Sequence, residues 1–322
     1  MGESFESVPC LLCGKQDTQV VARGEGPGQL VRCRHDGLVF LTPRPTVAFL
    51  REFHSRFVRE NNLELFDGYR REILRREAEA VKRLVPGGNL LDLGCATGTF
   101  FDYFPGDSWQ LFGVDTSGLG VKQARENRCA RIFQGALVEA QFPSDFFDVV
   151  TILDTLYYTP DPSGELREVH RILKNDGLVA VEIPGLTYTL LRAKKPVCWL
   201  LDGKTGGGLA DSCHLYHFSP NTIRRLLEGT GFRVLRRIPE QASLGGGMTR
   251  RMLSALHFRM AQAVHRGSRG RISIAGKELY LARRMATSRA FPVTPPRDAR
   301  FHPSQSGSGW IPHDFRRGMP AR

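Results

Sequence analysis

The segment from Asn89 to Phe100, NLLDLGCATGTF, constrains the fold more than any other part of this 322-residue chain. Its apolar run fits a buried strand, and the run stops at a carboxylate and then at two glycines, Gly94 and Gly98. Glycine lets the backbone bend sharply and lets a ligand approach closely. The residues after Gly98 can open a helix, whose N-terminus offers free N–H groups and partial positive charge. The pattern therefore predicts a nucleotide-type site.

A second half of such a site follows at the expected distance. The segment LFGVDTSGLGVKQARE reads as a strand ending at Asp115 and then a helix, and Asp115 lies 23 residues after Asp92. A carboxylate that closes the second strand of a doubly wound sheet can accept hydrogen bonds from both ribose hydroxyls. The spacing of Gly94 and Gly98 is not the G-x-G-x-x-G of dinucleotide sites, which argues against a dinucleotide ligand.

At this point the chain resembles the class I S-adenosylmethionine-dependent methyltransferases, whose first motif has the form D-x-G-C-x-x-G. Three later segments match in order: Phe146 to Val150 resembles the fourth-strand motif, Leu166 to Pro184 the next helix and strand, and His214 to Arg237 the helix and sixth strand of the small-molecule and sugar branch. The resemblance covers roughly residues 5 to 285.

The fold that this resemblance implies is α/β, a doubly wound, mostly parallel seven-stranded sheet of the Rossmann-like methyltransferase type with a small N-terminal ribbon. The alternation of apolar runs and helical patterns predicts strands near 89–93, 110–115, 131–134, 147–153, 177–183, 232–238 and 272–282. The last of them is expected to be the antiparallel edge strand.

The resemblance also implies a cofactor site. S-adenosylmethionine would contact Asp92, Gly94, Cys95, Gly98, Asp115, Ala136, Leu137 and Asp154. Many relatives have an acid where this chain has Ala136, so adenine would be held by apolar contact and backbone. Asp154 either supports the sulfonium charge or bonds backbone N–H groups in its turn. Nothing next to Cys95 supplies a base, so we expect a small residue that fits the loop rather than a nucleophile.

Candidates for a catalytic base lie where strands end. The family usually carries Glu-His where this chain has Tyr157 and Tyr158, and tyrosine titrates only near about 10 unless its site lowers that value. Tyr158 would orient an acceptor or, if perturbed, deprotonate it. His214 and His217 are the other candidates, although a histidine ahead of a helix also fits a local hydrogen-bonding role.

The N-terminal cysteines resemble the zinc ribbon that many relatives carry before a Pro-Arg-Pro segment. Cys10 and Cys13 form one C-x-x-C pair, whereas the second pair has Cys33 followed by Asp36 in place of a cysteine. A tetrahedral zinc needs four ligands. Either Asp36 or His35 completes the site, or the metal is lost and packing alone holds the ribbon. A zinc bound here would be structural, because all its positions would be closed.

The chain divides into four regions: a zinc-ribbon-like segment at 1–45, a helical preface at 46–86, a methyltransferase core at 87–285 and a basic tail at 286–322. Phe66 and Tyr69 of the preface fit either the substrate side or the core. A glycine-rich excursion between Pro184 and Tyr216 fits a mobile lid or a plain connection. The tail is rich in Pro, Gly, Ser and Arg, so we expect disorder there.

The net charge of +12 is concentrated in the last part of the chain. From Arg250 to Arg322 there are 15 Arg or Lys and 3 acids, so residues 1–249 are balanced with 30 of each. The region that carries the motifs is therefore neutral, which argues against a nucleic-acid partner. Seven cysteines, an odd number, suit a reducing cytoplasm. Neither a membrane span nor a secretory leader is indicated.

Together these patterns favour in-line transfer of a methyl group from S-adenosylmethionine to a small-molecule acceptor, with a glycan precursor or other secondary metabolite as the expected substrate. Alignment of the reacting atoms supplies roughly 7 to 11 kcal/mol of barrier reduction in such reactions. Two alternatives remain open: a scaffold protein that binds S-adenosylmethionine without turnover, and a nucleic-acid methyltransferase recruited by the basic tail.

Overall fold

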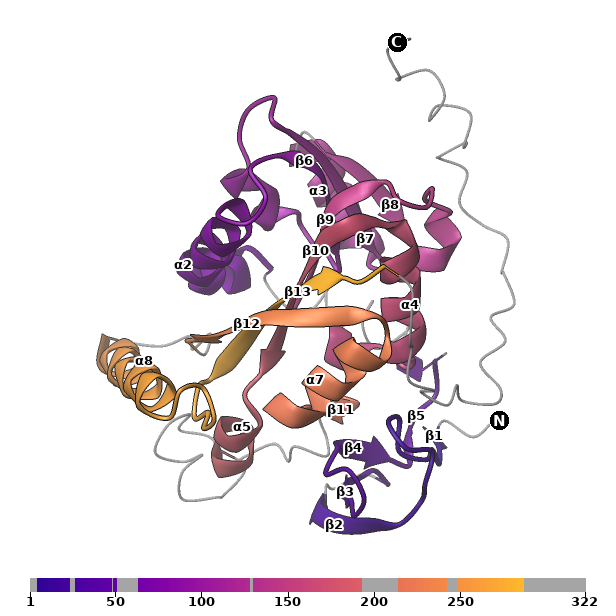
Figure 1. Ribbon diagram of the computed structural model, residues 1–322, viewed down its shortest axis with the longest axis vertical. Helices are drawn as coiled ribbons and strands as arrows, with labels where there is room; N and C mark the ends of the chain where they lie inside the picture. Colours follow the sequence, from indigo (N-terminus) through magenta and orange to yellow (C-terminus); the bar gives the residue numbers. More distant parts are fainter. Residues whose placement is uncertain are drawn as a thin grey trace.

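The computed structural model describes residues 5–23, 27–47, 49–50, 63–127, 130–192, 214–241 and 248–286. A seven-stranded sheet forms its centre, in the order β12-β13-β10-β9-β6-β7-β8 (Figure 1). Only β13 runs antiparallel to its neighbours, so the expected mostly parallel sheet is confirmed. The strands are β6 (Gly88–Leu93), β7 (Trp109–Asp115), β8 (Arg131–Gln134), β9 (Phe147–Leu153), β10 (Leu173–Pro184), β12 (Phe232–Glu240) and β13 (Lys277–Arg284).

Helices cover both faces of this sheet. Alternate strand residues point to opposite faces, and Leu91 of β6 belongs to a core with α4 (Pro162–Ile172) and α7 (Pro220–Gly229). Its neighbour Leu90 belongs to a second core with α2 (Leu63–Lys82) and α3 (Gly118–Asn127). Burial on both faces explains why the sheet strands read as near-continuous apolar runs.

The prediction that residues 272–282 form the edge strand was wrong in position. β13 begins at Lys277 and lies between β10 and β12, so β12 is the edge. Every β13 residue from Lys277 to Ala282 is buried, whereas β12 exposes Arg233 and Arg236. Exposed charges of this kind are typical of an edge strand, because they discourage pairing with another chain.

The bend after β6 is held by two glycines in the left-handed region. Gly94 has φ 81°, and a Cβ there would stand 2.1 Å from Oγ1 of Thr155, so a side chain does not fit. Gly98 has φ 75° and precedes a short 3₁₀ helix, η1 (Thr99–Tyr103). The helix expected after Gly98 is therefore present, but as a single five-residue 3₁₀ segment.

The N-terminal ribbon shares a strand with the core. Strands β2 (Thr18–Arg23), β3 (Gln29–Cys33) and β4 (Val39–Thr42) form an antiparallel sheet, and β11 (Tyr216–His217) adds to it beside β4. A separate pair joins β1 (Phe5–Glu6) to β5 (Arg44–Pro45). Residues 216–217, which follow the predicted lid, thus tie the ribbon to the core.

The remaining elements are short helices and one long one: η2 (Leu137–Ala140), η3 (Leu156–Tyr158), α5 (Leu186–Arg192) and α8 (Met248–Gly267). Several predictions lie outside the described residues: the side chains of Phe66 and Tyr69, the lid over 193–213 and the tail beyond 286. Among the described helices, none combines the length and the apolar character needed to cross a membrane.

Candidate functional site

Asp115 joins the two loops at the carboxyl ends of β6 and β7. Its Oδ2 accepts the backbone N–H of Ala96 at 2.9 Å, and its Oδ1 accepts that of Ser117 at 2.7 Å. Each carboxylate oxygen can accept more than one hydrogen bond. The carboxylate is therefore fixed by the backbone and keeps capacity for two ribose hydroxyls.

Asp92 is a buried carboxyl within β6. It is 4% exposed, and its Oδ1 accepts a hydrogen bond from Oγ1 of Thr151 at 2.6 Å. Burial raises its pKa to about 7, because the charged form loses solvation that the Thr151 hydroxyl only partly replaces. Its charge near neutral pH is therefore sensitive to a cation placed nearby.

Cys95 lies in the glycine loop with its thiol against the sheet. A Cβ on Gly113 of β7 would stand 2.6 Å from Sγ of Cys95, so the thiol fills the space that this glycine leaves. Burial raises its pKa well above the usual thiol value. A protonated, buried thiol is a poor nucleophile, which agrees with the packing role expected from the sequence.

Ala136 and Leu137 begin the turn after β8. The Ala136 N–H donates to Oε2 of Glu139 at 2.7 Å, and the Leu137 side chain is 1% exposed within the core. The Gly135 N–H donates to the carbonyl of Asp115 at 3.0 Å, so this turn does lie beside the second loop. Contact of these residues with adenine stays a prediction.

Asp154 follows β9 and has a left-handed backbone, with φ 59°. Its carboxylate accepts hydrogen bonds from Lys277 and from the Tyr157 hydroxyl, and it lies 3.3 Å from Nη1 of Arg70. Burial alone would raise its pKa, but the charges of Lys277 and Arg70 hold the pKa well below its usual range. In this structure Asp154 thus bonds side chains; its predicted contact with the sulfonium stays a prediction.

The ion pairs around Asp154 continue to Glu182, near the carboxyl end of β10. Glu182 of β10 is fully buried, 2.7 Å from Nη2 of Arg70 and 3.3 Å from Nζ of Lys277. Glu77 of α2 is also fully buried, and neither of its carboxylate oxygens has a hydrogen-bond partner among the described residues. Removing one partner from a buried ion pair typically costs about 3 to 5 kcal/mol, so the network fixes α2 on the sheet.

The sequence prediction missed this network. Glu182 carried a usable signal, because it is an acid inside the apolar run LVAVEIP. Arg70 carried none, because it is the first residue of the charged run RREILRREAEAVKR. Only its burial, at 8% exposure, separates it from exposed Arg71 and Arg75.

Tyr158 and His214, two predicted catalytic residues, are brought together. The Tyr158 hydroxyl lies 2.9 Å from Nε2 of His214. Burial lowers the pKa of His214 to about 4, so the imidazole is neutral near pH 7. In the tautomer that carries its proton on Nδ1, Nε2 accepts a hydrogen bond from the Tyr158 hydroxyl. The pair lies at the carboxyl end of β9, the neighbour of β6.

His217, the third predicted catalytic residue, lies behind this pair. It belongs to β11, is 4% exposed, and its ring centroid is 5.7 Å from that of His214. Burial lowers its pKa to about 3. The structure therefore places His217 in the ribbon sheet, with its ring beside that of His214, and a direct role in catalysis stays a prediction.

Arg44 of the Pro-Arg-Pro segment fixes the loop that carries Tyr158. Its Nη1 donates to the Pro160 carbonyl at 2.9 Å and to the Tyr216 hydroxyl at 2.8 Å, and its Nε donates to Glu6 at 2.8 Å. Arg44 is 6% exposed. The ribbon thus holds the loop after β9 and strand β11 in one arrangement.

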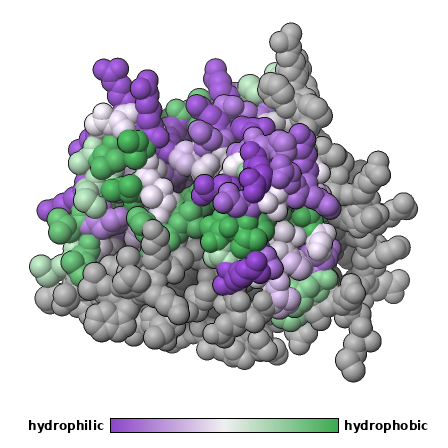
Figure 2. All heavy atoms as spheres, turned by 90° about the horizontal axis from the view of Figure 1, so that it is seen from below, coloured by the Kyte–Doolittle hydropathy of each residue, from purple (hydrophilic) through white to green (hydrophobic). Residues whose placement is uncertain are grey.

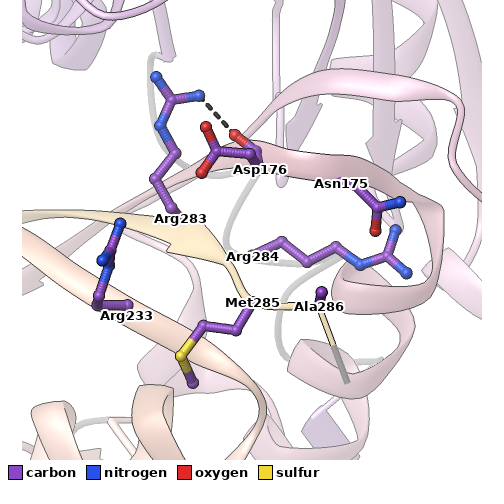
Figure 3. A pocket seen from close by; sticks show the side chains of 7 residues that line it. All are labelled: Asn175, Asp176, Arg233, Arg283, Arg284, Met285 and Ala286. Atoms are coloured by element: carbon purple, nitrogen blue, oxygen red, sulfur yellow. Dashed lines mark hydrogen bonds between the residues drawn. The ribbon is translucent and has the colours of Figure 1, made fainter. Parts of the chain in front are cut away.

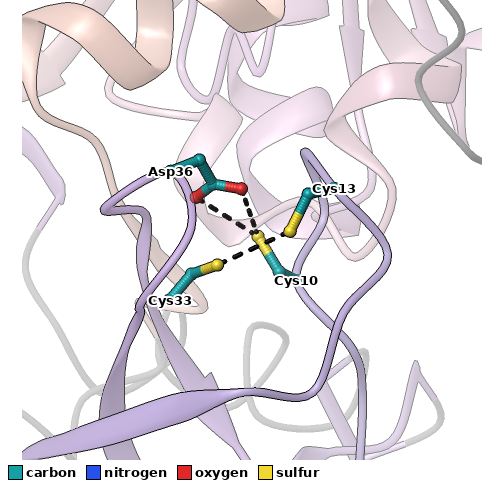
Figure 4. Close-up of side chains that lie close together, drawn as sticks. All are labelled: Cys10, Cys13, Cys33 and Asp36. Atoms are coloured by element: carbon teal, nitrogen blue, oxygen red, sulfur yellow. Dashed lines mark hydrogen bonds between the residues drawn. The ribbon is translucent and has the colours of Figure 1, made fainter.

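The four predicted metal ligands gather at one point of the ribbon. Cys10, Cys13, Cys33 and Asp36 direct their side chains toward one another (Figure 4), and their ligand atoms all lie within 4.8 Å of each other. Sγ of Cys13 is 3.5 Å from Sγ of Cys33, and Sγ of Cys10 is 3.2 Å from Oδ2 of Asp36.

His35, the alternative fourth ligand, is occupied elsewhere. Its Nε2 lies 3.2 Å from Asp17, and its Nδ1 lies 3.4 Å from Nζ of Lys15. Between the two candidates that the sequence left open, the geometry favours Asp36.

A cavity of about 330 Å³ lies at the opposite end of the sheet, where β10 and β12 begin and β13 ends. Two of the arginines that line it, Arg283 and Arg284, point to different sides (Figure 3). Arg283 donates to the Asp176 carbonyl and to that of Leu84, and Arg284 donates to Asp145 and to the Leu173 carbonyl. These two guanidinium groups do not converge, and the cavity lies at the end of the sheet opposite Asp115 and the glycine loop, so it is not part of the candidate site.

A family model described as a methyltransferase domain matches residues 65–237, and the chain belongs to this family. It is 33% identical over 113 residues to the demethylmenaquinone methyltransferase of Lysinibacillus sphaericus, covering 31% of this chain and 48% of that protein. The ubiquinone/menaquinone biosynthesis C-methyltransferase UbiE of Geotalea uraniireducens is 31% identical over 182 residues, 50% of this chain and 77% of that protein.

The chain is also similar to solved structures of methyltransferases. One is an S-adenosylmethionine-dependent methyltransferase of Thermotoga maritima, described as a possible histamine N-methyltransferase. It has 20% identity and a TM-score of 0.47, and the match covers 73% of this chain and 99% of that one. The chain spans about half the length of the demethylmenaquinone methyltransferases that it matches.

Proposed function

We propose that this protein transfers the methyl group of S-adenosylmethionine to a small-molecule acceptor by in-line displacement. One observation carries the proposal: the loop held by Gly94 and Gly98, the carboxylate of Asp115 and the Tyr158–His214 pair all lie at the carboxyl ends of the adjacent strands β7, β6 and β9. In open α/β sheets, ligands bind at this edge.

The residues present suit the cofactor. Gly94 leaves no room for a side chain, so backbone lines the loop, and Asp115 is oriented by two backbone N–H groups. We propose that Asp115 holds the ribose and that Asp92, with the loop from Gly94 to Gly98, contacts the methionine part. When bound, S-adenosylmethionine supplies an activated methyl group. The protein's task is then to align the acceptor and to exclude water.

The Tyr158–His214 pair would orient the acceptor. A histidine with a pKa near 4 is a weak general base near pH 7. We therefore expect the Tyr158 hydroxyl to act mainly by hydrogen bonding to the acceptor, while His214 fixes the orientation of that hydroxyl. Arg44 supports this arrangement from the ribbon.

The acceptor belongs, in our proposal, to the glycan precursors or other secondary metabolites. Relatives named for demethylmenaquinone methylation support a small-molecule acceptor.

Incubation of the purified full chain with S-adenosylmethionine labelled in its methyl group should label a small molecule in an extract of the source cells, which mass spectrometry can identify. The same incubation without the protein is the control. Calorimetric binding of S-adenosylmethionine with no labelled product from any extract would favour the scaffold alternative. Label found only in RNA or DNA would contradict the small-molecule proposal.

We also propose that Cys10, Cys13, Cys33 and Asp36 hold a structural zinc. Ligands at the usual Zn–S distance of about 2.3 Å stand about 3.8 Å apart at the corners of a tetrahedron. The Sγ–Sγ separation of 3.5 Å between Cys13 and Cys33 is close to that spacing, and all four ligand atoms lie within 4.8 Å of one another. Four protein ligands leave no open position, so such a zinc stabilises the ribbon and takes no part in methyl transfer.

Metal analysis of the purified protein should find about one zinc per chain, because the four ligand groups already converge. Asp36→Ala should weaken zinc binding at least about tenfold, measured by competition with a chromogenic chelator. Cys95→Ser is the matched control, since Cys95 is a buried cysteine outside the cluster. A wild-type protein that folds with its ribbon intact and carries no zinc would show that packing alone holds this segment.

A further inference from the structure

The connection between β12 and β13 is much longer than the sheet requires. The two strands are antiparallel neighbours, and Glu240 pairs with Lys277 at their open end. Such strands can be joined by a two-residue hairpin. Here residues 241–276 intervene, and they include the 20-residue helix α8. The helix is therefore not explained by the need to connect the strands.

One side of α8 packs against the protein. Ser254 and Ala261 are 6% and 2% exposed, and Ser254 accepts a hydrogen bond from Gln241 at 2.8 Å. The guanidinium of Arg76 from α2 stacks over the ring of Phe258, 5.1 Å from its centroid. These contacts fix α8 beside α2, on the side of the sheet edge that carries the buried ion pairs.

The opposite side of α8 is apolar and exposed. Met252, Leu256 and Met260 follow one another at intervals of four residues, so they form one stripe along the helix, with Leu253 beside it. Their exposed fractions are 66%, 66%, 52% and 47%. In the view from below (Figure 2), apolar and hydrophilic residues lie side by side on the left, the side that carries α8 in Figure 1.

The surroundings of this stripe are basic. The sequence contains no Asp or Glu between Glu240 and Glu278, but seven Arg or Lys. Arg259 and Arg266 are exposed and lie on the outward side of α8, next to the stripe. Arg269 and Arg271 follow the helix, and Ile272 beside them is 57% exposed. Apolar and cationic side chains therefore share one surface, and the segment between Glu240 and Glu278 adds no acid to it.

We propose that the outward face of α8 docks on an anionic lipid bilayer. Helices that lie in the membrane interface bury an apolar stripe at the level of the headgroups and place Lys or Arg among the anionic lipids. A second copy of the chain fits this face less well, because symmetric pairing would bring Arg259 and Arg266 against the same residues of the partner. A phosphate backbone would satisfy the arginines but would leave the stripe of Met252, Leu256 and Met260 in water.

Docking by α8 would bring the edge of the sheet that carries the candidate site toward the bilayer. The helix begins at Met248, eight positions after Glu240; Glu240 pairs with Lys277, and Lys277 is bonded to Asp154 of the candidate site. The docking surface itself contains none of the residues assigned to methyl transfer. A failure of the proposed enzymatic function would therefore leave the docking proposal untouched.

Co-sedimentation with vesicles tests the proposal on the full chain. We expect at least about tenfold stronger binding to vesicles of phosphatidylcholine and phosphatidylglycerol (7:3) than to pure phosphatidylcholine, and weaker binding at high salt. The variant Met252→Gln, Leu256→Gln, Met260→Gln should bind about tenfold or more weakly. The double variant Arg259→Gln, Arg266→Gln should lose roughly thirtyfold on the anionic vesicles, because each arginine contributes roughly fivefold.

A matched control replaces three exposed apolar residues elsewhere, as Val20→Gln, Val21→Gln, Leu84→Gln, and should bind the vesicles like the wild type. Thermal unfolding of each variant shows whether the fold is kept. Equal binding by the wild type and the α8 variants, or no binding by the wild type, overturns the proposal. Two other results would also overturn it, if the α8 substitutions left vesicle binding unchanged. One is a dimer, seen in sedimentation equilibrium, that these substitutions abolish. The other is an affinity for an RNA oligonucleotide that they abolish.

Discussion

Asp115→Ala should weaken S-adenosylmethionine binding by at least about a hundredfold. The substitution removes a carboxylate that we propose as the acceptor for two ribose hydroxyls, and hydrogen bonds to a charged group contribute about 1.5 to 3 kcal/mol each. It also frees the N–H groups of Ala96 and Ser117, so the glycine loop and the second loop lose their common anchor. Loss of contacts and loss of loop order act in the same direction.

Isothermal titration calorimetry with S-adenosylmethionine measures this effect. Asp107→Ala is the matched control, because Asp107 is an exposed acid just before β7, and it should bind like the wild type. Both variants should unfold cooperatively, since the carboxylate of Asp115 is not a core side chain. Affinity within about threefold of the wild type in Asp115→Ala would remove the ribose assignment.

The parts of the site that the sequence predicted well are those built from neighbouring residues. The run from Leu90 to Gly98 specifies a buried strand and a bend because its side chains alternate between two covered faces and its glycines adopt positive φ. Asp115 was found for the same reason, since it ends the next strand. Local patterning therefore sufficed for the strand, the bend and the position of Asp115, while contact of these residues with the cofactor stays a prediction.

The order of the strands was harder to predict. The segment RISIAGKELYL reads as a strand, but its own residues do not say whether it has one neighbour or two. β13 is central because β12 pairs outside it, and the excursion through α8 separates the two strands in sequence. The arginines of β12, in FRVLRRIPE, were the sequence signal that could have identified β12 as the edge strand.

The contacts between distant residues could not be read from spacing. Tyr158 and His214 were predicted separately, because each lies at the end of an element, but 56 residues separate them and only the fold shows that their polar atoms meet. Asp154 was predicted to face the sulfonium or the backbone, and its partners turned out to be Lys277 and Arg70, 123 and 84 positions away in the chain. Ion pairs of this kind depend on burial, which charge patterns in a single helix do not reveal.

Tyr158→Phe should lower kcat by about a hundredfold, because a misplacement of the reacting groups by about 1 Å can cost that much. The ring stays in place, and only the hydroxyl that meets Nε2 of His214 is lost. The affinity for S-adenosylmethionine should not change, because Asp115 and the glycine loop are untouched. Tyr103→Phe is the matched control, since the Tyr103 hydroxyl donates to the Arg71 carbonyl away from the pair.

The pH dependence of kcat distinguishes hydrogen bonding by Tyr158 from general-base catalysis by His214. Burial lowers the pKa of His214 to about 4, below the usual value of about 6.5, so the imidazole stays neutral from alkaline pH down to about pH 4 and becomes charged only below it. The pH profile of the wild-type kcat should therefore contain no break near pH 6.5 that is due to His214. The profile of His214→Gln should have the same shape in this range. A break at that pH that disappears in His214→Gln, or a Tyr158→Phe variant as active as the wild type, would contradict the proposal, because the pair would then act through a titrating base or not at all.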